Sequence, residues 1–202
     1  MDVVRLDRIA VEEAVRVVGL ARDEDEAGAG DWERDSPCAG WSLRRLVAHM
    51  AAQHRGFAAA ARGVGGEPAH WREPEDLGAP AEVHRAAAAD VLDAFAEPGV
   101  EGREFTLPEL GLTVPGRPAI GFHLVDYVVH AWDVAATLGV RLELPDDVLA
   151  AALAVARRVP ADPGSRGDGF AFAPASLVPE GAGALEETLR LLGRKPEPQM
   201  LL

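Results

Sequence analysis

The segment that most constrains the fold is residues 118–138, which are apolar around nearly the whole circumference of a helix. Pro118 suits the first turn of such a helix, and Gly139 suits the position just after its end. A helix that is apolar on almost every side is usually central and buried. The segment therefore predicts a helical protein built around this element. Its apolar side chains are Ile120, Phe122, Leu124, Val125, Val128, Val129, Trp132 and Val134.

One polar stripe interrupts this apolar surface. His123, Asp126, His130 and Asp133 stand at positions i, i+3, i+7 and i+10, which share one face of a helix. Because the rest of the helix is apolar, the stripe should face inward or into a cleft. Buried ionisable groups need partners or a metal ion. The stripe is therefore the first place to look for chemistry.

Helix geometry limits which members of the stripe can share one ion. His123 and His130 are separated by two turns, about 10 Å along the axis, so they do not meet on the same ion. Asp126 and His130 are one turn apart and form a common half-site for Zn²⁺ and similar ions. His123 would then not bind the ion itself, but would support the ligands or line the cavity. Asp133 could orient His130 by accepting its other N–H.

A third ligand has to come from another element, and His49 is the best candidate. A helix over residues 42–61 is predicted, with Ser42 as its N-cap. His49 stands beside Leu46 and Met50 at the edge of the apolar stripe of that helix, so it should face inward. The other histidines outside the central helix are placed less favourably, further round the same helix, in a loop, or near a helix start: His54, His70 and His84.

Other interpretations of these residues stay open. A lone histidine on an apolar helix face is often a hydrogen-bonded core residue, and the stripe of the central helix has the pattern of a buried structural network as well. Asp133 could equally be a solvated position or a cap for a neighbouring loop. Cys38, the only cysteine, is interpreted as an inert, half-buried thiol.

The remaining elements follow from periodicity and from breaks in it. Apolar residues at helical spacing predict further helices, and the Gly- and Pro-rich stretches between them predict loops. Around residues 104–107 a short extended stretch is consistent with a small hairpin or a plain crossover. The other predicted helices cover residues 3–21, a segment that follows Pro80 and ends before Pro98, residues 145–159 and residues 184–192, with a loop over 160–182.

Composition narrows the functional classes. The formal net charge of −13 argues against nucleic-acid binding and against docking to an anionic membrane, since both need clustered Lys and Arg. No apolar run reaches transmembrane length, and the N-terminal residues lack the apolar core of a signal peptide. A single cysteine fits a reducing compartment. We therefore expect a cytoplasmic protein.

Several segments resemble one family. Residues 37–49 (PCAGWSLRRLVAH) and 123–135 (HLVDYVVHAWDVA) look like the two histidine-bearing motifs of the mycothiol-dependent maleylpyruvate isomerase N-terminal, DinB-like families, which are typical of actinobacteria. Residues 172–174 and 191–196 are similar to the tail of a subgroup whose members mostly lack an assigned reaction. The resemblance covers nearly the whole chain.

The resemblance implies a mostly α fold, a DinB-like up-down four-helix bundle with an additional short C-terminal helix and tail. Residues 1–160 would form the metal-binding bundle, and residues 161–202 a tail that packs on it. His49, Asp126 and His130 would be the metal ligands. In the isomerase the middle ligand is a glutamate, so the carboxylate here is one methylene shorter.

The implied function is that of a metal-dependent transferase or isomerase that uses mycothiol or another small thiol. Three protein ligands leave an open position on the ion, where a thiol would be deprotonated and nucleophilic. His123 or Asp133 could then shuttle protons; no catalytic residue is assigned. We expect strong maleylpyruvate isomerase activity to be lacking, because the isomerase's separate C-terminal domain is not matched here.

Three alternatives remain. A water in place of the thiol would give a hydrolase, a fully coordinated ion would indicate a structural or sensor protein, and a degenerated site would hold no ion. The expected cofactors are a divalent metal ion, Zn²⁺ ahead of Ni²⁺ or another ion, and mycothiol. The expected partner is a small-molecule thiol or electrophile, with no nucleic acid and no membrane. A homodimer is left open.

Overall fold

The apolar segment predicted at the centre of the fold forms α4 (Gly116–Leu138), the longest helix among the described residues. The computed structural model describes residues 2–23, 30–38, 40–74, 77–160, 166–167 and 172–197. Side chains on all sides of α4 are buried, including the fully buried Trp132 and Tyr127. The prediction of a central, buried helix is therefore confirmed.

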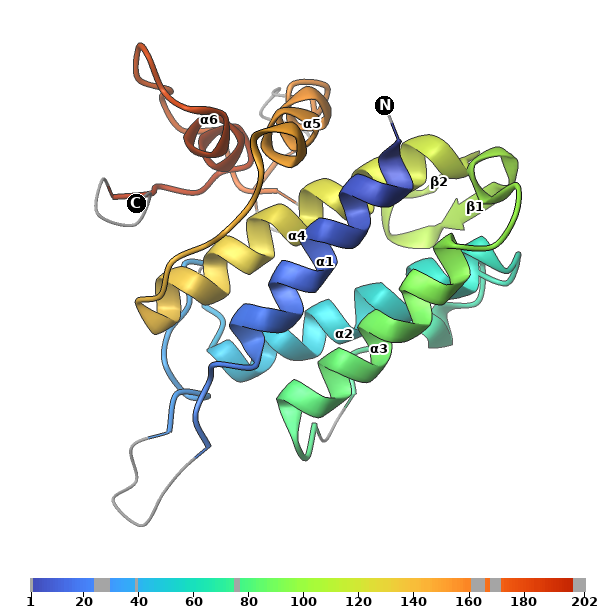
Figure 1. Cartoon of the computed structure of the whole chain (residues 1–202), viewed down its shortest axis with the longest axis horizontal. Helices are drawn as coiled ribbons and strands as arrows, with labels where there is room; N and C mark the ends of the chain where they lie inside the picture. The colour runs from blue at the N-terminus through green and yellow to red at the C-terminus, as the bar shows by residue number, and fades with distance from the viewer. Residues whose placement is uncertain are drawn as a thin grey trace.

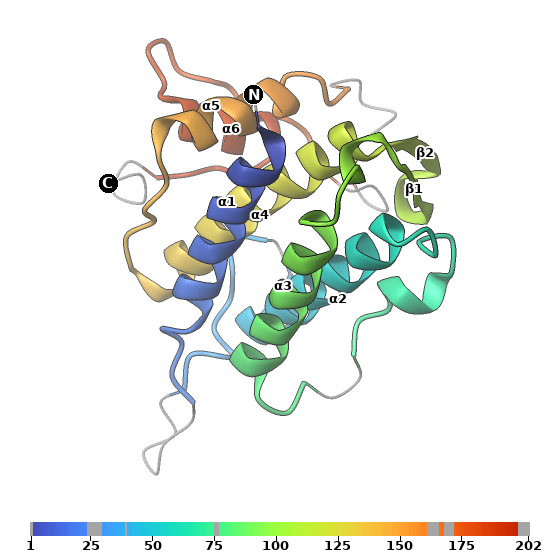
Figure 2. The same cartoon turned by 45° about the vertical axis from the view of Figure 1, so that its right-hand side comes forward.

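Four long helices, α4 among them, form a bundle (Figures 1 and 2). The other three are α1 (Val3–Val18), α2 (Leu43–Ala61) and α3 (Pro80–Phe95). The most extensive packing is of α1 against α4 and of α2 against α3. As the colours show, α1 and α4 run in one direction and α2 and α3 in the other. The predicted four-helix bundle is therefore present, with its helices in the order up, down, down, up.

Local signals place the helix ends. The Ser42 side chain accepts a hydrogen bond from the Arg45 backbone N–H at 3.4 Å and caps α2, as the sequence predicts. Pro80 stands in the first turn of α3. Gly139, with a left-handed φ of 70°, ends α4, because glycine adopts this conformation without steric cost.

A contact between distant residues moves the start of α4 two residues ahead of the predicted Pro118. The backbone N–H of Gly116 donates to the carbonyl of Arg103 at 2.7 Å. A Cβ at Gly116 would lie 2.1 Å from the carbonyl oxygen of Val100, so only glycine fits here. Sequence periodicity carries no information about this approach.

The extended stretch before α4 is a hairpin rather than a crossover. Strand β1 (Glu104–Leu107) pairs antiparallel with β2 (Leu112–Pro115), and Phe105 lies opposite Val114. The buried side chains of Phe105 and Leu107 fix the hairpin against the end of the bundle. Three short 3₁₀ helices complete this end of the molecule: η1 (Pro68–Trp71), η2 (Val100–Gly102) and η3 (Pro108–Leu110).

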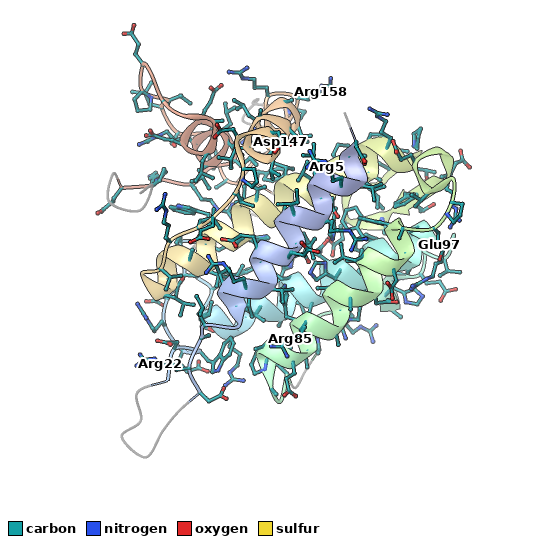
Figure 3. All side chains as sticks on the ribbon, viewed as in Figure 1. Arg5, Arg22, Arg85, Glu97, Asp147 and Arg158 are labelled. Carbon is teal, nitrogen blue, oxygen red and sulfur yellow. The ribbon has the colours of Figure 1, made fainter. Side chains whose placement is uncertain are left out.

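Two further helices lie beside the bundle. The predicted helices at residues 145–159 and 184–192 form α5 (Asp146–Ala156), which packs on α4, and α6 (Ala184–Leu191), which packs on α5. An ion pair between Arg5 and Asp147 joins α1 to α5 (Figure 3). Residues 161–165, where the predicted tail begins, lie outside the described residues.

Among the helices that the structure describes, none is both long enough and apolar enough to cross a membrane.

Candidate metal centre

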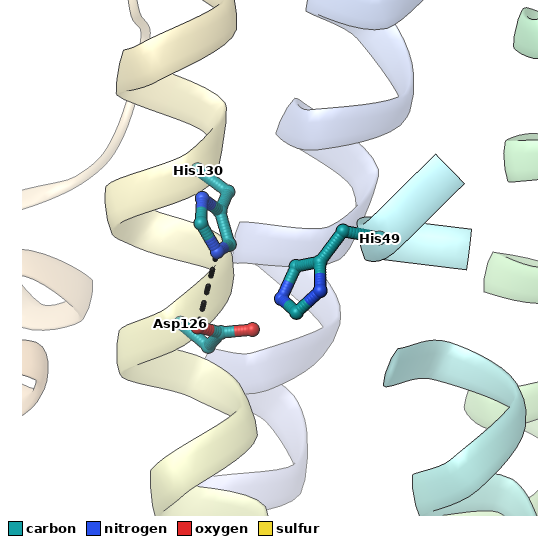
Figure 4. Close-up of side chains that lie close together, drawn as sticks. All are labelled: His49, Asp126 and His130. Atoms are coloured by element: carbon teal, nitrogen blue, oxygen red, sulfur yellow. Dashed lines mark ion pairs between the residues drawn. The ribbon is translucent and has the colours of Figure 1, made fainter. Parts of the chain in front are cut away.

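The three residues predicted as metal ligands lie together between α2 and α4 (Figure 4). One possible ligand atom from each of His49, Asp126 and His130 lies within 4.8 Å of those of the other two. His130 Nε2 is 3.3 Å from Asp126 Oδ1, and the rings of His49 and His130 are 5.5 Å apart between centroids. Within the described part of the chain, this is the one group of three such side chains that could hold a metal ion.

The triad lies where the bundle meets solvent. The side chains of His49 and Asp126 are 22% and 27% exposed, whereas that of His130 is 7% exposed. One side of the cluster can therefore be reached from outside, through His49 and Asp126, while His130 is held in the core. A site of this kind can hold an ion and still admit a further ligand.

The inner nitrogen of His130 is held by a buried ion pair. His130 Nδ1 lies 3.0 Å from Asp133 Oδ2, and Asp133 is fully buried. Arg194, which follows α6, donates to both carboxylate oxygens of Asp133, at 2.7 and 3.2 Å. A carboxylate behind a ligand histidine fixes the ring and leaves Nε2 as the metal-binding atom.

These contacts set the charge states of the group. Burial alone would lower the pKa of His130, but the carboxylates of Asp126 and Asp133 outweigh it and raise that pKa to about 9. Burial raises and His130 lowers the pKa of Asp126, which falls to about 2. Burial would raise the pKa of Asp133, but the guanidinium of Arg194 outweighs this effect and lowers that pKa. Both carboxylates are therefore ionised at neutral pH.

A carboxylate also contacts His49, from the surface side. Its Nδ1 lies 3.5 Å from Glu73 Oε1, and this contact is the largest cause of the lowered pKa of Glu73. The edge of Trp41 meets the His49 ring at a centroid distance of 4.9 Å. Arg45 in turn stacks on Trp41, with its guanidinium carbon 4.6 Å from the ring centroid. These residues form the exposed border of the triad.

His123 belongs to a different cluster, in keeping with its two-turn separation from His130. His123 Nδ1 lies 2.7 Å from Asp7 Oδ1, and its Nε2 lies 3.1 Å from Nδ1 of His54. The His54 ring stacks on Tyr127 at 3.9 Å and lies 5.1 Å from the ring of His84. We call Asp7, His54, His84 and His123 the buried histidine cluster. All four are fully buried.

Burial governs the ionisation of the buried histidine cluster. It lowers the pKa of His54 well below its ordinary value of 6.5 and lowers that of His84 to about 3. Burial likewise raises the pKa of Asp7. Nε2 of His54, both ring nitrogens of His84 and Oδ2 of Asp7 have no hydrogen-bond partner among the described residues. His54 and His84 are therefore neutral at neutral pH.

Sequence reasoning missed three residues with direct roles in these contacts. Arg194 and Glu73 stand in irregular segments, where no periodicity shows which way a side chain points. Asp7 lies on a face of α1 that is otherwise buried and apolar, and that was the one signal that could have found it. Cys38, a half-buried free cysteine, has a pKa raised by burial, in line with an inert thiol.

The donor set of the triad fits a divalent transition metal. Two imidazole nitrogens and one carboxylate match the three-ligand pattern of catalytic zinc sites, which leaves a fourth position open. Ligand atoms bound at about 2.1 Å in a tetrahedron are about 3.4 Å apart. Small side-chain movements would therefore bring the three donors from their present separations onto one ion.

Fold and site together define a class: a helical bundle with a candidate His/Asp/His metal centre between its second and fourth long helices. The model of the family described as the mycothiol maleylpyruvate isomerase N-terminal domain matches residues 12–135, a range that contains all three residues of the triad. The chain belongs to this family.

Individual proteins are also similar to the chain. Two uncharacterized proteins of Mycobacterium tuberculosis, one from each of two strains, are 33% identical to the chain over 159 residues, which cover 79% of this chain and 82% of theirs. Two crystal structures of the mycothiol-dependent maleylpyruvate isomerase, the first of a histidine-to-alanine mutant, align with TM-scores of 0.56 and 0.52 at 16% and 19% identity. Each alignment covers 77% of this chain but 66% of the isomerase chain. This similarity shows the fold.

Proposed function

We propose that the protein is a metal-dependent enzyme that uses a small thiol, of the transferase or isomerase type, with His49, Asp126 and His130 as its metal ligands. The observation that carries the proposal is the convergence of the three donors at a partly exposed position, in a chain that belongs to a family named for a mycothiol-dependent isomerase. Zn²⁺ fits the donor set, and Ni²⁺ is the alternative.

The residues around the triad would keep its donors in place. Asp133 and Arg194 hold the His130 ring from the core side, and Glu73 approaches His49 from the surface side. The contact of Arg194 with Asp133 supports our further proposal that residues 161–202 form a tail that packs on a bundle of residues 1–160. When bound, a divalent ion would supply an open position that favours the thiolate form of a thiol at neutral pH.

Proton transfer to the substrate has to come from somewhere other than His123 or Asp133. His123 is fully buried between Asp7 and His54, and Asp133 is fully buried in its pair with Arg194. We therefore assign Asp133 a positioning role and His123 a structural one. No side chain is assigned as general acid or base.

Metal analysis of protein purified without chelators or an affinity tag for metals tests the ligand assignment. We expect about one divalent ion per chain, and we expect its loss in both His49→Ala and His130→Ala. His70→Ala is the matched control, because His70 is a half-exposed histidine of the η1 segment that pairs with Glu67 and is not a member of the triad. Full metal content in both ligand variants would contradict the assignment.

A second experiment tests the thiol. Cobalt-loaded protein is titrated with mycothiol and, separately, with a simple thiol, and the visible spectrum is followed for thiolate binding. We expect a saturable spectral change with mycothiol, and none with the His130→Ala variant. With cobalt demonstrably bound, an unchanged spectrum at millimolar thiol would reject the thiol and leave the hydrolytic and structural alternatives.

A further inference from the structure

A second candidate site lies away from the triad, in a groove of about 400 Å³ between α2, the η1 segment and α3. Three arginines line the groove against one carboxylate, that of Asp90, so the lining carries net positive charge. Its full lining is Arg55, Ala59, Arg62, Val64, Ala69, His70, Arg72 and Asp90. Pockets of a few hundred Å³ are the usual size for small-molecule sites.

This concentration of arginine is unusual for the chain, which carries 20 Lys and Arg against 33 Asp and Glu. Arg62 is paired with Asp90 at 2.7 Å and lies 3.8 Å from Glu97, so its charge is largely neutralised. In the part of the chain that the structure describes, Arg55 and Arg72 have no ion pair, and Nη2 of Arg55 is buried without a hydrogen-bond partner. Two guanidinium groups in the groove therefore have charge available for a ligand.

The walls of the groove are held in place by packing. The indole N–H of Trp71 donates to the carbonyl of Gly65 at 2.8 Å. A Cβ at Gly56 would lie 2.3 Å from the Trp71 ring, so glycine here lets the indole pack directly on α2. Trp71 lies between His70 and Arg72 in the chain. Its packing therefore fixes the backbone positions from which these two side chains extend. The ion pair of Arg62 with Asp90 ties α2 to α3.

The groove and the triad are separate sites. Arg55, Ala59 and Arg62 stand at positions i, i+4 and i+7 and share one face of α2. At 100° per residue, His49 points about 80° or more away from each of them, and it lies about 9 Å along the axis from Arg55. A ligand in the groove would therefore not be a ligand of the metal centre.

We propose that this groove binds the phosphate group of a small phosphorylated molecule. Guanidinium groups donate paired hydrogen bonds to oxyanions, with a geometry that suits phosphate. Arginines that reach the groove from α2 and from the segment after η1 can address different oxygens of one tetrahedral group. The volume of the groove leaves room for the organic part of a phosphomonoester.

Isothermal titration of the full chain with inorganic phosphate, at constant ionic strength set with chloride, tests the proposal. We expect saturable binding, weakened at least tenfold in Arg55→Gln and in Arg72→Gln. Arg85→Gln is the matched control, because Arg85 is an exposed arginine of α3 that does not line the groove (Figure 3). Circular dichroism of each variant shows whether it is folded. Arg72 is exposed, so the Arg72→Gln variant removes no core side chain.

The outcomes are distinct. Tighter binding of glycerol phosphate than of inorganic phosphate would identify a phosphomonoester, and equal binding would identify the phosphate group alone; both support the proposal. No saturable binding of phosphate, an equal loss in Arg85→Gln, or binding of succinate but not phosphate would overturn it. Metal content is measured on the same samples, so this result is independent of the fate of the metal centre.

Discussion

The buried histidine cluster should make the bundle sensitive to acid, and His84 allows this to be measured. Both ring nitrogens of His84 are buried with no hydrogen-bond partner in the described part of the chain, and burial lowers its pKa in the folded protein to about 3, against an ordinary value of 6.5. The unfolded chain therefore binds a proton at pH values where the folded chain does not. The stability that His84 contributes is present above about pH 6.5 and is lost as the pH falls from 6.5 toward 3.

The magnitude follows from the two pKa values. Between pH 7 and pH 5, linkage gives a loss of about 2 kcal/mol from His84 alone, and the full shift corresponds to about 5 kcal/mol. His54 acts in the same sense as His84, because its pKa is also lowered, whereas Asp7 and His130 act in the opposite sense, because their pKa values are raised. The wild-type profile by itself would therefore mix several contributions.

A His84→Leu variant isolates the contribution of His84. Urea unfolding followed by far-UV circular dichroism gives the free energy of unfolding of both proteins at pH 8, 7, 6 and 5. At pH 8 the difference between them reports packing alone, since the histidine is neutral in both states. Between pH 7 and pH 5 the wild type should lose about 2 kcal/mol more than the variant. Parallel profiles for the two proteins would refute the reasoning.

Three further predictions concern contacts that support the fold and the triad. Arg194→Met leaves the buried Asp133 without its cation and should cost about 3 kcal/mol and weaken metal retention; unchanged urea stability would contradict this. Gly56→Ala places a methyl group against the Trp71 ring and should cost about 1–3 kcal/mol, measured as a lower Tm; a wild-type Tm would show that the ring can move. Ser42→Ala should cost about 1 kcal/mol through the lost N-cap, and Ser42→Asp should restore it.

The helices could be predicted because their signals are local. Ser42, Pro80 and Gly139 mark helix ends through their own backbone and side-chain chemistry, and the structure places helix ends at or next to all three. The start of α4 was predicted two residues late, because the fit of Gly116 against Val100 depends on a contact outside the helix. The choice between a hairpin and a crossover also depended on tertiary packing, because the buried side chains of Phe105 and Leu107 hold β1 against the bundle.

The triad could be assembled from the sequence for the same reason. Asp126 and His130 are joined by helical spacing, and the edge of the apolar stripe of α2 pointed to His49. The same argument passed over His54, which is fully buried in the other cluster. Their role as metal ligands stays a prediction. Arg194 and Glu73 could not be predicted, because each reaches its partner from an irregular segment whose path is set by the folded bundle.

The polar stripe of α4 illustrates how one sequence pattern can serve two purposes. At its His123 end, Asp7 from α1 and His54 from α2 close over the side chain, and no member of the buried histidine cluster is exposed. At its other end the triad keeps partial exposure through His49 and Asp126. A sealed group affects stability through its ionisation, whereas an exposed group can exchange ligands with solvent. Substitutions at the first end should therefore alter the pH dependence of unfolding, and substitutions at the second should alter metal content.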